Sequence, residues 1–412
     1  MKQIPLNKLK IINDPVYGFI NLRYESVYHL IEHPLFQRLR RIRQLGMTHV
    51  VYPGANHTRF QHALGAMHLM ENAIESIRNK GHDITNEEAE AATIAILLHD
   101  IGHGPFSHTL ENTLISGIQH EKISLMMMEK LNNEFEGKLS LAIQIFKNTY
   151  QKKFLHQLVS GQLDVDRMDY LRRDSFFTGV SEGAIGSDRI IKMLVVNNDQ
   201  LVVEEKGIYS IEKFLVARRL MYWQVYLHKG VLAADQLLKM LLKRAHELAK
   251  NGEKLHATPA LEYFLYNMGG EFNELNKDIF LRYFAELDDN DIISAAKVWS
   301  KHEDPVLNFL CAGFVNRKLF RIEIQNAPFK PGKIEKIKNE VAEKLNIDKS
   351  LCNFLVNVNR ISNHAYSNLD DNIKILRKDG TVKDIQDVSE ILNVSVLSKN
   401  KEKFYLSYPK NL

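Results

Sequence analysis

The chain has 412 residues, more than one ordinary hydrophobic core organises, so we expect two domains or one domain with a large appendage. Its content of 45% apolar and 25% charged residues is typical of a soluble globular protein. The net charge of +4 is mild and favours an anionic ligand held locally over a broad nucleic-acid surface. Residues 1–6 lack the apolar core of a signal peptide, and no apolar run approaches membrane-spanning length. Because the two cysteines lack metal-type spacing, we expect a reducing, cytoplasmic location.

Helical periodicity dominates from about residue 25 to residue 185. The apolar residues at positions 35, 36, 39, 42 and 45 form one amphipathic stripe that ends at Gly46. Thr85 and Glu88 have the spacing of a capping box, which predicts that a helix begins there. The nearly continuous apolar run at 91–98 indicates that the later part of this helix is buried.

The later part of the chain mixes helices and strands. Residues 193–196 and 201–203 flank the turn 197–199, which predicts a β-hairpin, and long helices return over 211–248. Strands are predicted among shorter helices at 319–324, 373–376 and 404–408. We therefore expect a mostly α fold, with a helical catalytic domain at residues 1–254 that includes the hairpin, and a smaller α+β region at 255–412.

The most specific motif lies at the inner end of the buried apolar run, where His99 and Asp100 follow directly. A bare carboxylate there would be costly to bury, and a divalent metal ion is the most economical compensating charge. The glycines at 102 and 104 break the helix, which predicts that His103 and His108 lie on a turn facing the same place. The alternative is a hydrogen-bonded core histidine beside a capping aspartate.

Two further residues favour the metal over that alternative. His62 precedes the dyad and Asp166 follows it, so that His62, His99, Asp100 and Asp166 form a mixed nitrogen–oxygen set. Such a set suits manganese, iron, magnesium or, less typically, zinc, and the identity of the metal stays open. An ion held in this way can polarise a phosphoryl oxygen and lower the pKa of a bound water. The dyad resembles the signature of the HD metallophosphohydrolases.

Residues beside the predicted ligands indicate the substrate. Asp166, Tyr170 and Asp174 recur at intervals of four and share one helix face, with Arg167 beside it. A cation there suits phosphate, while a carboxylate and a phenol suit sugar hydroxyls. The alternative is a solvated face with pairs between residues 169 and 173.

More distant residues extend this interpretation. Arg59 shares a helical edge with His62 and can hold a second phosphate, and Arg218 shares a face with Tyr226. His120 follows a short loop and can approach His103, and paired imidazoles near a phosphate can donate protons. The alternatives are a surface arginine, a half-buried tyrosine and a surface His-Glu pair.

Taken in order, these blocks resemble the HD-domain deoxynucleoside triphosphate triphosphohydrolases, including the animal enzymes that add a SAM domain. The similar blocks lie within residues 10–230 and are Ile12-Asn13-Asp14-Pro15, Phe36-Gln37-Arg38-Leu39-Arg40, Gln44-Leu45-Gly46, Tyr52-Pro53-Gly54-Ala55, Arg59-Phe60-Gln61-His62, residues 99–108, His120-Glu121 and residues 164–174. The resemblance implies an HD-domain helical core for the first region.

The resemblance also implies roles for individual residues. The metal ligands would be His62, His99, Asp100 and Asp166. The chemistry would be served by His103, His108 and His120, with Glu111 and Glu121 as orienting carboxylates. The triphosphate would be held by Arg59, Arg167 and Arg218, the 3′-hydroxyl by Tyr170 and Asp174, and the deoxyribose and base by Gln44 and Leu45. Tyr226 would close the sugar pocket against a ribose 2′-hydroxyl.

A second set of matches concerns regulation. In relatives that need an activating guanine nucleotide, a pocket between subunits is formed by residues like Lys10, Ile11, Asn13, Glu32, Gln37 and Arg40. The segment at 317–321, with Arg317 and Arg321, resembles the one that completes the pocket from the C-terminal region. The resemblance thus implies a homo-oligomer, a tetramer, activated by dGTP or GTP. The alternative is that the arginines at 38, 40, 41 and 43 form a solvated basic face.

The leading hypothesis is a metal-dependent dNTP triphosphohydrolase that converts dNTP and water to deoxynucleoside and inorganic triphosphate. A second hypothesis is another HD phosphohydrolase that acts on a nucleoside monophosphate, an alarmone or a cyclic nucleotide. The three arginines expected to hold a triphosphate, at 59, 167 and 218, argue against a monophosphate substrate. Tyr170 and Asp174 argue against a substrate that lacks a free 3′-hydroxyl. A third, a non-catalytic nucleic-acid-binding or scaffold protein, is disfavoured by the complete metal set and the modest charge, although single-strand binding stays open.

Overall fold

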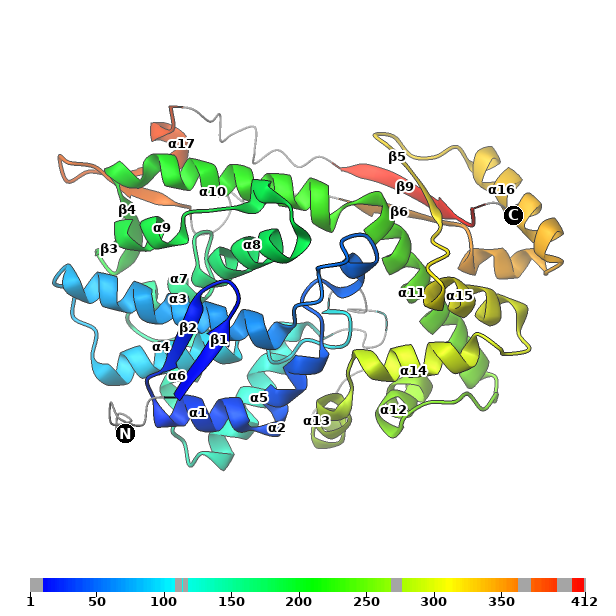
Figure 1. Ribbon diagram of the computed structural model, residues 1–412, viewed down its shortest axis with the longest axis horizontal. Coiled ribbons are helices and arrows are strands. Elements are labelled where there is room, and N and C mark those ends of the chain that lie inside the picture. The colour runs from blue at the N-terminus through cyan, green and yellow to red at the C-terminus, as the bar shows by residue number, and fades with distance from the viewer. Residues whose placement is uncertain are drawn as a thin grey trace.

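The computed structural model describes residues 10–107, 113, 118–267, 276–361, 372–390 and 402–410. Helices make up most of the described chain, and three small sheets accompany them (Figure 1). The predicted fold class, a mostly α core followed by an α+β region, is confirmed.

The first group of helices is built on the long helix α3. Its members are α1 (Glu25–Glu32), α2 (Pro34–Gln37), α3 (Arg59–Asn79), α4 (Asn86–Leu98), α5 (His120–Glu134), α6 (Ser140–Phe146), α7 (Lys153–Val159), α8 (Val165–Thr178) and α9 (Ser187–Met193). The long α3 packs against both α4 and α8 (Figure 1). This packing brings together the three helices that carry or adjoin the predicted metal ligands.

The start of α4 has the predicted capping box. The backbone N–H of Glu88 donates to Thr85 Oγ1 at 3.2 Å, and the backbone N–H of Thr85 donates to Glu88 Oε2 at 2.8 Å. Every residue from 91 to 98 is buried, as the apolar run predicts. His99 is the residue that ends the helix, so the dyad emerges inside the protein.

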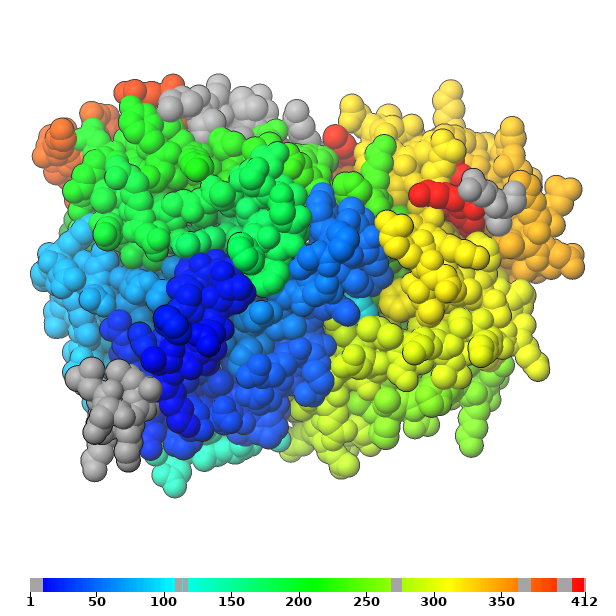
Figure 2. All heavy atoms as spheres, viewed as in Figure 1, coloured from blue at the N-terminus to red at the C-terminus, as the bar shows by residue number. Residues whose placement is uncertain are grey.

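The second group of helices begins with α10 (Ile208–Met221) and continues, after a π-helical turn at Tyr222–Tyr226, into α11 (Lys229–Lys250). The later helices are α12 (Pro259–Asn267), α13 (Lys277–Glu286), α14 (Asp289–Trp299), α15 (Pro305–Val315), α16 (Pro331–Leu345) and α17 (Ile385–Val388). Because α11 packs against the 3₁₀ turn at Gly46–Val50 as well as against α12 and α15, it links the first region of the chain to the later helices (Figure 1). Figure 2 shows the blue and green surface of the first region beside the yellow and orange surface of the second.

The strands form three separate sheets. The first sheet pairs β1 (Lys10–Asp14) and β2 (Gly18–Leu22) in antiparallel fashion. The second sheet has the strand order β3 (Leu194–Asn197), β4 (Gln200–Glu204), β7 (Lys374–Leu376), β8 (Val382–Asp384). The third sheet has the strand order β5 (Arg321–Gln325), β9 (Lys403–Tyr408), β6 (Asn357–Ile361). The predicted hairpin is β3–β4, and its turn residues Asn198 and Asp199 have positive φ values of 48° and 60°, as a two-residue hairpin turn requires. Since β7 pairs in parallel with β4, the region after residue 255 extends the hairpin sheet, and the division at residue 254 stays a prediction.

The predicted stripe at residues 35–45 is wrong as a single helix. Its apolar residues at 35, 36, 39 and 42 are buried as expected, but α2 ends at Gln37, a 3₁₀ turn covers Arg38–Arg41, and Ile42 is extended. The change to a 3₁₀ turn begins at the fully buried Arg38, whose guanidinium donates to the backbone carbonyls of Leu287 and His103 at 2.9 and 2.8 Å.

The four arginines do not share one face: Arg38 is buried and Arg43 half-buried, whereas Arg40 and Arg41 are exposed, as the alternative of a solvated basic face expects. Besides the buried Arg38, Arg41 and Arg43 pair with the aspartates at 288 and 289, and Arg40 lies 3.6 Å from the centre of the Phe60 ring. The arginines diverge because the 3₁₀ turn rotates successive side chains by about a third of a turn.

Among the described residues, no helix is both long enough and apolar enough to cross a bilayer.

Candidate active site

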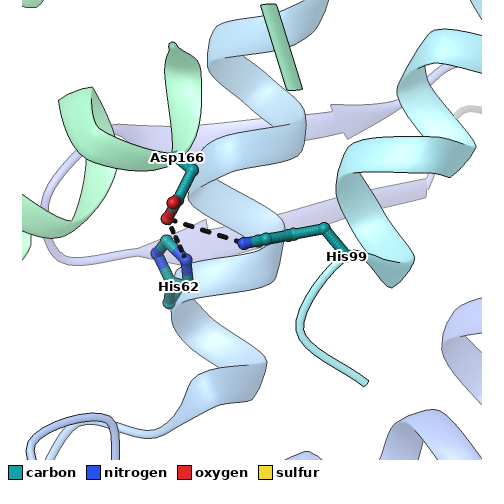
Figure 3. Close-up of side chains that lie close together, drawn as sticks. All are labelled: His62, His99 and Asp166. Atoms are coloured by element: carbon teal, nitrogen blue, oxygen red, sulfur yellow. Dashed lines mark ion pairs between the residues drawn. The ribbon is translucent and has the colours of Figure 1, made fainter. Parts of the chain in front are cut away.

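Three predicted ligands form one cluster at the junction of α3, α4 and α8. His62 Nε2 lies 3.1 Å from Asp166 Oδ1, and His99 Nε2 lies 3.5 Å from the same oxygen (Figure 3). The donor atoms of the three residues all lie within 4.8 Å of one another. Two imidazoles and a carboxylate that converge on one point are a ligand set for a divalent metal ion.

The two histidines present buried nitrogen atoms that the described protein leaves unsatisfied. His62 Nε2 and His99 Nε2 are both buried and form no hydrogen bond with any described residue. The other nitrogen of each ring is held: His99 Nδ1 is 2.6 Å from the carbonyl oxygen of Ile96, and His62 Nδ1 is 2.7 Å from Asp169 Oδ2. A partner at Nδ1 fixes a ring so that Nε2 is the ligating atom, and the donor set therefore fits a metal ion.

The partner of His62 belongs to a buried ionic chain. Asp169 also accepts from Arg173, with Nε and Nη2 distances of 3.0 Å, and Arg173 Nη1 donates to Asp14 Oδ2 at 2.8 Å. The alternative that residues 169 and 173 form solvated pairs is wrong, because neither side chain is exposed. Gly65 of α3 permits this approach, since a Cβ there would lie 2.0 Å from Asp169 Oδ1.

The cluster carries an excess of negative charge. Burial would lower the pKa of His62, but the carboxylates of Asp166 and Asp169 raise it to about 10. Burial would raise the pKa of Asp166, yet the two histidines hold it well below its usual range. In the absence of a metal ion, these carboxylates would hold a proton on the imidazole. A divalent cation supplies the same positive charge to neutral ligands.

Asp100 lies between this cluster and an arginine. Its Oδ1 is 3.4 Å from His99 Nε2 and 3.2 Å from His103 Nε2, and its Oδ2 is 3.7 Å from His62 Nε2 and paired with Arg59. Burial would raise the pKa of Asp100, but His99, Arg59 and His103 hold it well below its usual range. The buried carboxylate is therefore compensated partly by Arg59, for which the sequence predicted only a phosphate contact.

The predicted pair of imidazoles is present. The rings of His103 and His120 are stacked with their centroids 3.9 Å apart, and both donor groups lie close to Asp100. His120 Nε2 is 3.4 Å from the exposed Glu121. Predicted residues His108 and Glu111 lie outside the described residues.

A cavity of about 480 Å³ opens beside these groups. It is lined by Gln44, Leu45, Gly46, Thr48, Arg59, Asp100, His103, Phe106, Ser107, His120, Asp166, Arg167, Tyr170, Asp174, Tyr222, Tyr226, Leu227, Val231, Leu232, Asp235 and Lys239. Every predicted substrate residue except Arg218 is in this lining. The sequence analysis missed the wall from α11, where Asp235 and Lys239 interrupt an otherwise buried stretch over 231–242.

The arginines differ in how they meet the cavity. Arg167 borders it, and its Nε donates to the carbonyl of Gly161 at 2.7 Å. Arg218 is buried behind the lining, where its Nη1 donates to Gln162 at 3.1 Å and its Nε has no hydrogen bond with a described residue. Burial raises the pKa of Tyr170, and both arginines oppose that rise, so each lies near its phenol.

The far end of the cavity is built around Asp174. Tyr226 Oη donates to Asp174 Oδ2 at 2.7 Å, and His57 Nε2 lies 2.7 Å from Asp174 Oδ1. His57 is buried and stacked on Phe177, with ring centroids 4.6 Å apart. The sequence offered no pattern for His57; its contact depends on the pairing of two segments far apart in the chain.

A second cavity, of about 600 Å³, lies against β1 and α1. It is lined by Lys10, Ile11, Ile12, Asn13, Asp14, Leu22, Tyr28, Ile31, Glu32, Arg40, Thr58, Phe60, Gln61 and Leu64. It thus brings together five of the residues predicted for an activator. Gln37 accepts a hydrogen bond from Arg40 Nε at 2.8 Å but is not in the lining.

The other predicted activator residues lie elsewhere in the chain. Arg317 Nε donates to the carbonyl of Val50 at 2.6 Å, and Arg321 is the first residue of β5. Figure 1 shows β5 far from β1. Within one chain, the second cavity is therefore formed without these two arginines.

Two imidazoles and a carboxylate on three packed helices, beside a cavity bordered by arginine, define a metal-dependent hydrolase. The chain matches the HD domain family over residues 59–174, and the HD associated region over 185–263. A solved phosphohydrolase from Bacteroides thetaiotaomicron is 55% identical, with a TM-score of 0.94, and the match covers 98% of this chain and 100% of that one.

Two further relatives extend the comparison. The uncharacterized protein YwfO of Bacillus subtilis is 30% identical over 99% of this chain and 94% of its own length. The human deoxynucleoside triphosphate triphosphohydrolase SAMHD1 is 27% identical over 69% of this chain and 52% of its own length. The chain belongs to the HD-domain family of phosphohydrolases, whose members bind a divalent metal ion.

Proposed function

We propose that this chain is a metal-dependent dNTP triphosphohydrolase that converts dNTP and water to a deoxynucleoside and inorganic triphosphate. The observation that carries the proposal is one continuous cavity with two chemically different ends. Asp100 and Asp166 lie at the end with the metal ligands, while Tyr170, Asp174 and Tyr226 supply phenols and a carboxylate. Arg59 and Arg167 supply positive charge to the same lining.

We assign the metal to His62, His99, Asp100 and Asp166. When bound, the ion would polarise a phosphoryl oxygen and lower the pKa of a bound water. The chain itself must hold the triphosphate, and guanidinium groups suit this task because they pair with phosphate oxygens in a planar, bidentate manner. Arg167 faces the cavity, Arg59 reaches it from beside Asp100, and Arg218 reinforces the positive charge from behind the wall.

Attack by water on the α-phosphorus leaves a 5′-oxygen that needs a proton. His103 and His120 both border the cavity. Burial, and then the charge of Arg59, lower the pKa of His103 well below its usual range, so this ring is neutral at neutral pH. We therefore assign the proton donor to His120, with His103 packed against it. The roles of His108, Glu111 and Glu121 stay predictions.

The sugar end follows from the contacts of Asp174. Because His57 and Tyr226 hold its two oxygens, its carboxylate is fixed in place and can accept a hydrogen bond from a 3′-hydroxyl. The rings of Tyr170 and Tyr226 meet edge to face, with centroids 6.4 Å apart, and we infer that this wall excludes a ribose 2′-hydroxyl. Gln44 and Leu45 would contact the deoxyribose and the base. The buried Oε1 of Gln44 has no hydrogen bond with a described residue and could accept one from the nucleotide.

The direct test incubates the purified protein with each dNTP and each NTP in the presence of Mn²⁺ and separates the products. We expect dGTP to give deoxyguanosine and intact triphosphate. The appearance of dGMP with pyrophosphate, or of dGDP with phosphate, would show that a different bond is broken. Turnover of a nucleoside monophosphate, an alarmone or a cyclic nucleotide, with dNTPs left intact, would favour another HD phosphohydrolase.

We also propose that the second cavity binds a guanine nucleotide in a homo-oligomer, a tetramer. Glu32 can accept from the N1 and N2 hydrogens of guanine, and Lys10 and Arg40 can meet phosphate. Lys10 now lies over the ring of Tyr28, 3.1 Å from its centre. Because neither Arg317 nor Arg321 lines this cavity within one chain, they would have to come from a second subunit.

A further inference from the structure

The turn that follows the metal dyad has an unusual backbone. Phe106 and Ser107 both have φ values of 51°, in the left-handed region that residues with a Cβ rarely adopt. Both residues line the substrate cavity. Two consecutive residues hold this conformation only when their surroundings impose it. The contacts that impose it therefore help to shape the cavity.

One contact comes from the distant region of the chain. The carboxylate of Asp289, the first residue of α14, accepts the backbone N–H of Phe106 at Oδ1, at 2.7 Å. Its Oδ2 accepts the backbone N–H of Arg43 at 3.0 Å. The Asp289 side chain is only 2% exposed, so these hydrogen bonds form away from water, where bonds to a charged acceptor are strong.

The position of the turn is passed on to the predicted phosphate-binding arginine. Ser107 Oγ donates to the backbone carbonyl of Arg43 at 3.1 Å. Arg59 Nε donates to the same Ser107 Oγ at 2.7 Å, and Arg59 also pairs with Asp100. A change in the backbone at residue 106 would therefore move the hydroxyl that aligns the Arg59 guanidinium.

The other end of the turn is tied to the same distant segment. Arg38 donates through Nη2 to the carbonyl of His103 at 2.8 Å, and through Nε to the carbonyl of Leu287 at 2.9 Å. The segment 287–289, at the start of α14, thus holds the end of the turn at Phe106 directly through Asp289 and the end at His103 indirectly through Arg38. The polypeptide after residue 255 is part of the structure that holds the catalytic turn.

We propose that Asp289 is a positioning residue for this active site: by accepting the amides of Phe106 and Arg43, it sets the turn that places Ser107, and through it Arg59, at the substrate cavity. Asp289 does not line that cavity and acts only through other residues. The inference rests on the proposed function for the reaction that is assayed, but the hydrogen bonds that it invokes do not depend on the substrate.

The test compares Asp289→Ala, Asp289→Asn and the control Asp291→Ala in the full chain. Asp291 also caps the start of α14, where it accepts the backbone N–H of Asp288 at 2.7 Å, and it contacts Thr258 instead of the turn. The control therefore weakens the same helix end without removing a turn contact. Asn at 289 keeps one acceptor oxygen and should give an intermediate effect.

The first readout is hydrogen–deuterium exchange of a peptide that covers residues 101–107, which needs no substrate. We expect exchange about ten- to hundredfold faster in Asp289→Ala than in Asp291→Ala, because the charged acceptor of the Phe106 amide is lost. The second readout is turnover of dGTP. Here kcat should fall about tenfold or more in Asp289→Ala, while Mn²⁺ affinity stays within about threefold, since the four proposed ligands, at 62, 99, 100 and 166, all lie outside the turn at 103–106.

Equal exchange and equal kcat in Asp289→Ala and Asp291→Ala would overturn the proposal, because both changes would then act only through α14. Faster exchange with unchanged kcat would also overturn it, because the turn would be loosened without consequence. If the wild-type chain does not hydrolyse dNTPs, the proposed function fails. The exchange readout then decides separately whether Asp289 holds the turn.

Discussion

His62 on α3 and Asp169 on α8 are joined at 2.7 Å through Nδ1 and Oδ2, and neither side chain is exposed to solvent. The contact leaves His62 Nε2 facing Asp166 and His99, the two other members of the cluster. Since Arg173 holds Asp169 in turn, the orientation of His62, a proposed metal ligand, depends on the ion pair between Asp169 and Arg173.

Replacing this partner should weaken metal binding. We expect Asp169→Asn to lower Mn²⁺ affinity about 10- to 100-fold, because the Asp169 carboxylate at Nδ1 fixes the His62 ring and raises the basicity of Nε2 as a ligand. Titration followed by electron paramagnetic resonance of free Mn²⁺ measures the effect. Asp188→Asn is the matched control. The Asp188 side chain, on α9, is 72% exposed and contacts Arg172, which lies on α8 as Asp169 does. Equal affinities in the two variants would contradict the role of Asp169.

A proposed ligand should be needed for both metal and turnover. Asp100→Asn keeps the volume of the side chain but removes the charge, and we expect it to lose bound metal and hydrolysis while circular dichroism stays unchanged. Asp100→Ala should lose the same functions, with some stability as well, because the buried Arg59 then loses the side-chain oxygen that asparagine would still offer it. Full metal occupancy and normal rates in either variant would remove Asp100 from the ligand set.

Local sequence patterns predicted much of this site because they act over short distances. The capping box at Thr85, the buried run at 91–98 and the glycine-rich turn together placed His99 and Asp100 where the structure has them. The interval of four along α8 placed Tyr170 and Asp174 on the cavity wall.

The contacts that orient the site could not be predicted in the same way. His57 meets Asp174 across 117 positions, and Phe106 meets Asp289 across 183. Such pairs follow from the packing of whole elements, which periodicity does not reveal. Asp166 and Asp169 are three positions apart on one helix, a spacing that puts both carboxylates on the same side, next to His62. The error over residues 35–45 involves contacts of the same kind, because the 3₁₀ turn begins at Arg38, whose guanidinium donates to the carbonyls of Leu287 and His103.

The tyrosine rings at 170 and 226, proposed to exclude a ribose 2′-hydroxyl, predict the substrate specificity. We expect the wild-type chain to hydrolyse dATP faster than ATP. Tyr226→Phe should lower kcat/KM for dATP about 3- to 10-fold, because it removes the 2.7 Å hydrogen bond to Asp174, while the ring still excludes ribose. Tyr226→Ala should narrow the ratio of dATP to ATP turnover, and Tyr209→Ala, at a 62% exposed position, should leave it unchanged. An unaltered ratio in Tyr226→Ala would reject the proposed wall.

Stability should depend on pH through Glu71. Burial raises the pKa of Glu71 from 4.5 to about 7, although Arg23 opposes the rise at 3.2 Å. The folded state therefore holds a proton that the unfolded state releases, so this contribution to stability is complete below about pH 4.5 and is lost as the pH rises to about 7. We expect Glu71→Gln to gain about 1–3 kcal/mol relative to wild type across this interval, measured by urea unfolding. Glu75→Gln, at a 58% exposed side chain, should show no such trend.

The second cavity predicts how assembly and activity respond to guanine nucleotide. Lys10, Glu32 and Arg40 line the second cavity within one chain, while Arg317 and Arg321 do not, so we propose that a nucleotide bound there joins subunits. A ligand that binds only the assembled form stabilises it in proportion to the logarithm of its concentration over its dissociation constant. We expect light scattering to show a tetramer favoured by dGTP or GTP, and initial rates on the other dNTPs to rise with it.

Glu32→Ala should abolish this response and keep the basal rate, whereas Glu25→Ala, on the same helix at a 61% exposed side chain, should retain the response. A strict monomer with rates indifferent to dGTP would reject the regulatory proposal, and the catalytic one would still stand because its cavity is formed within a single chain.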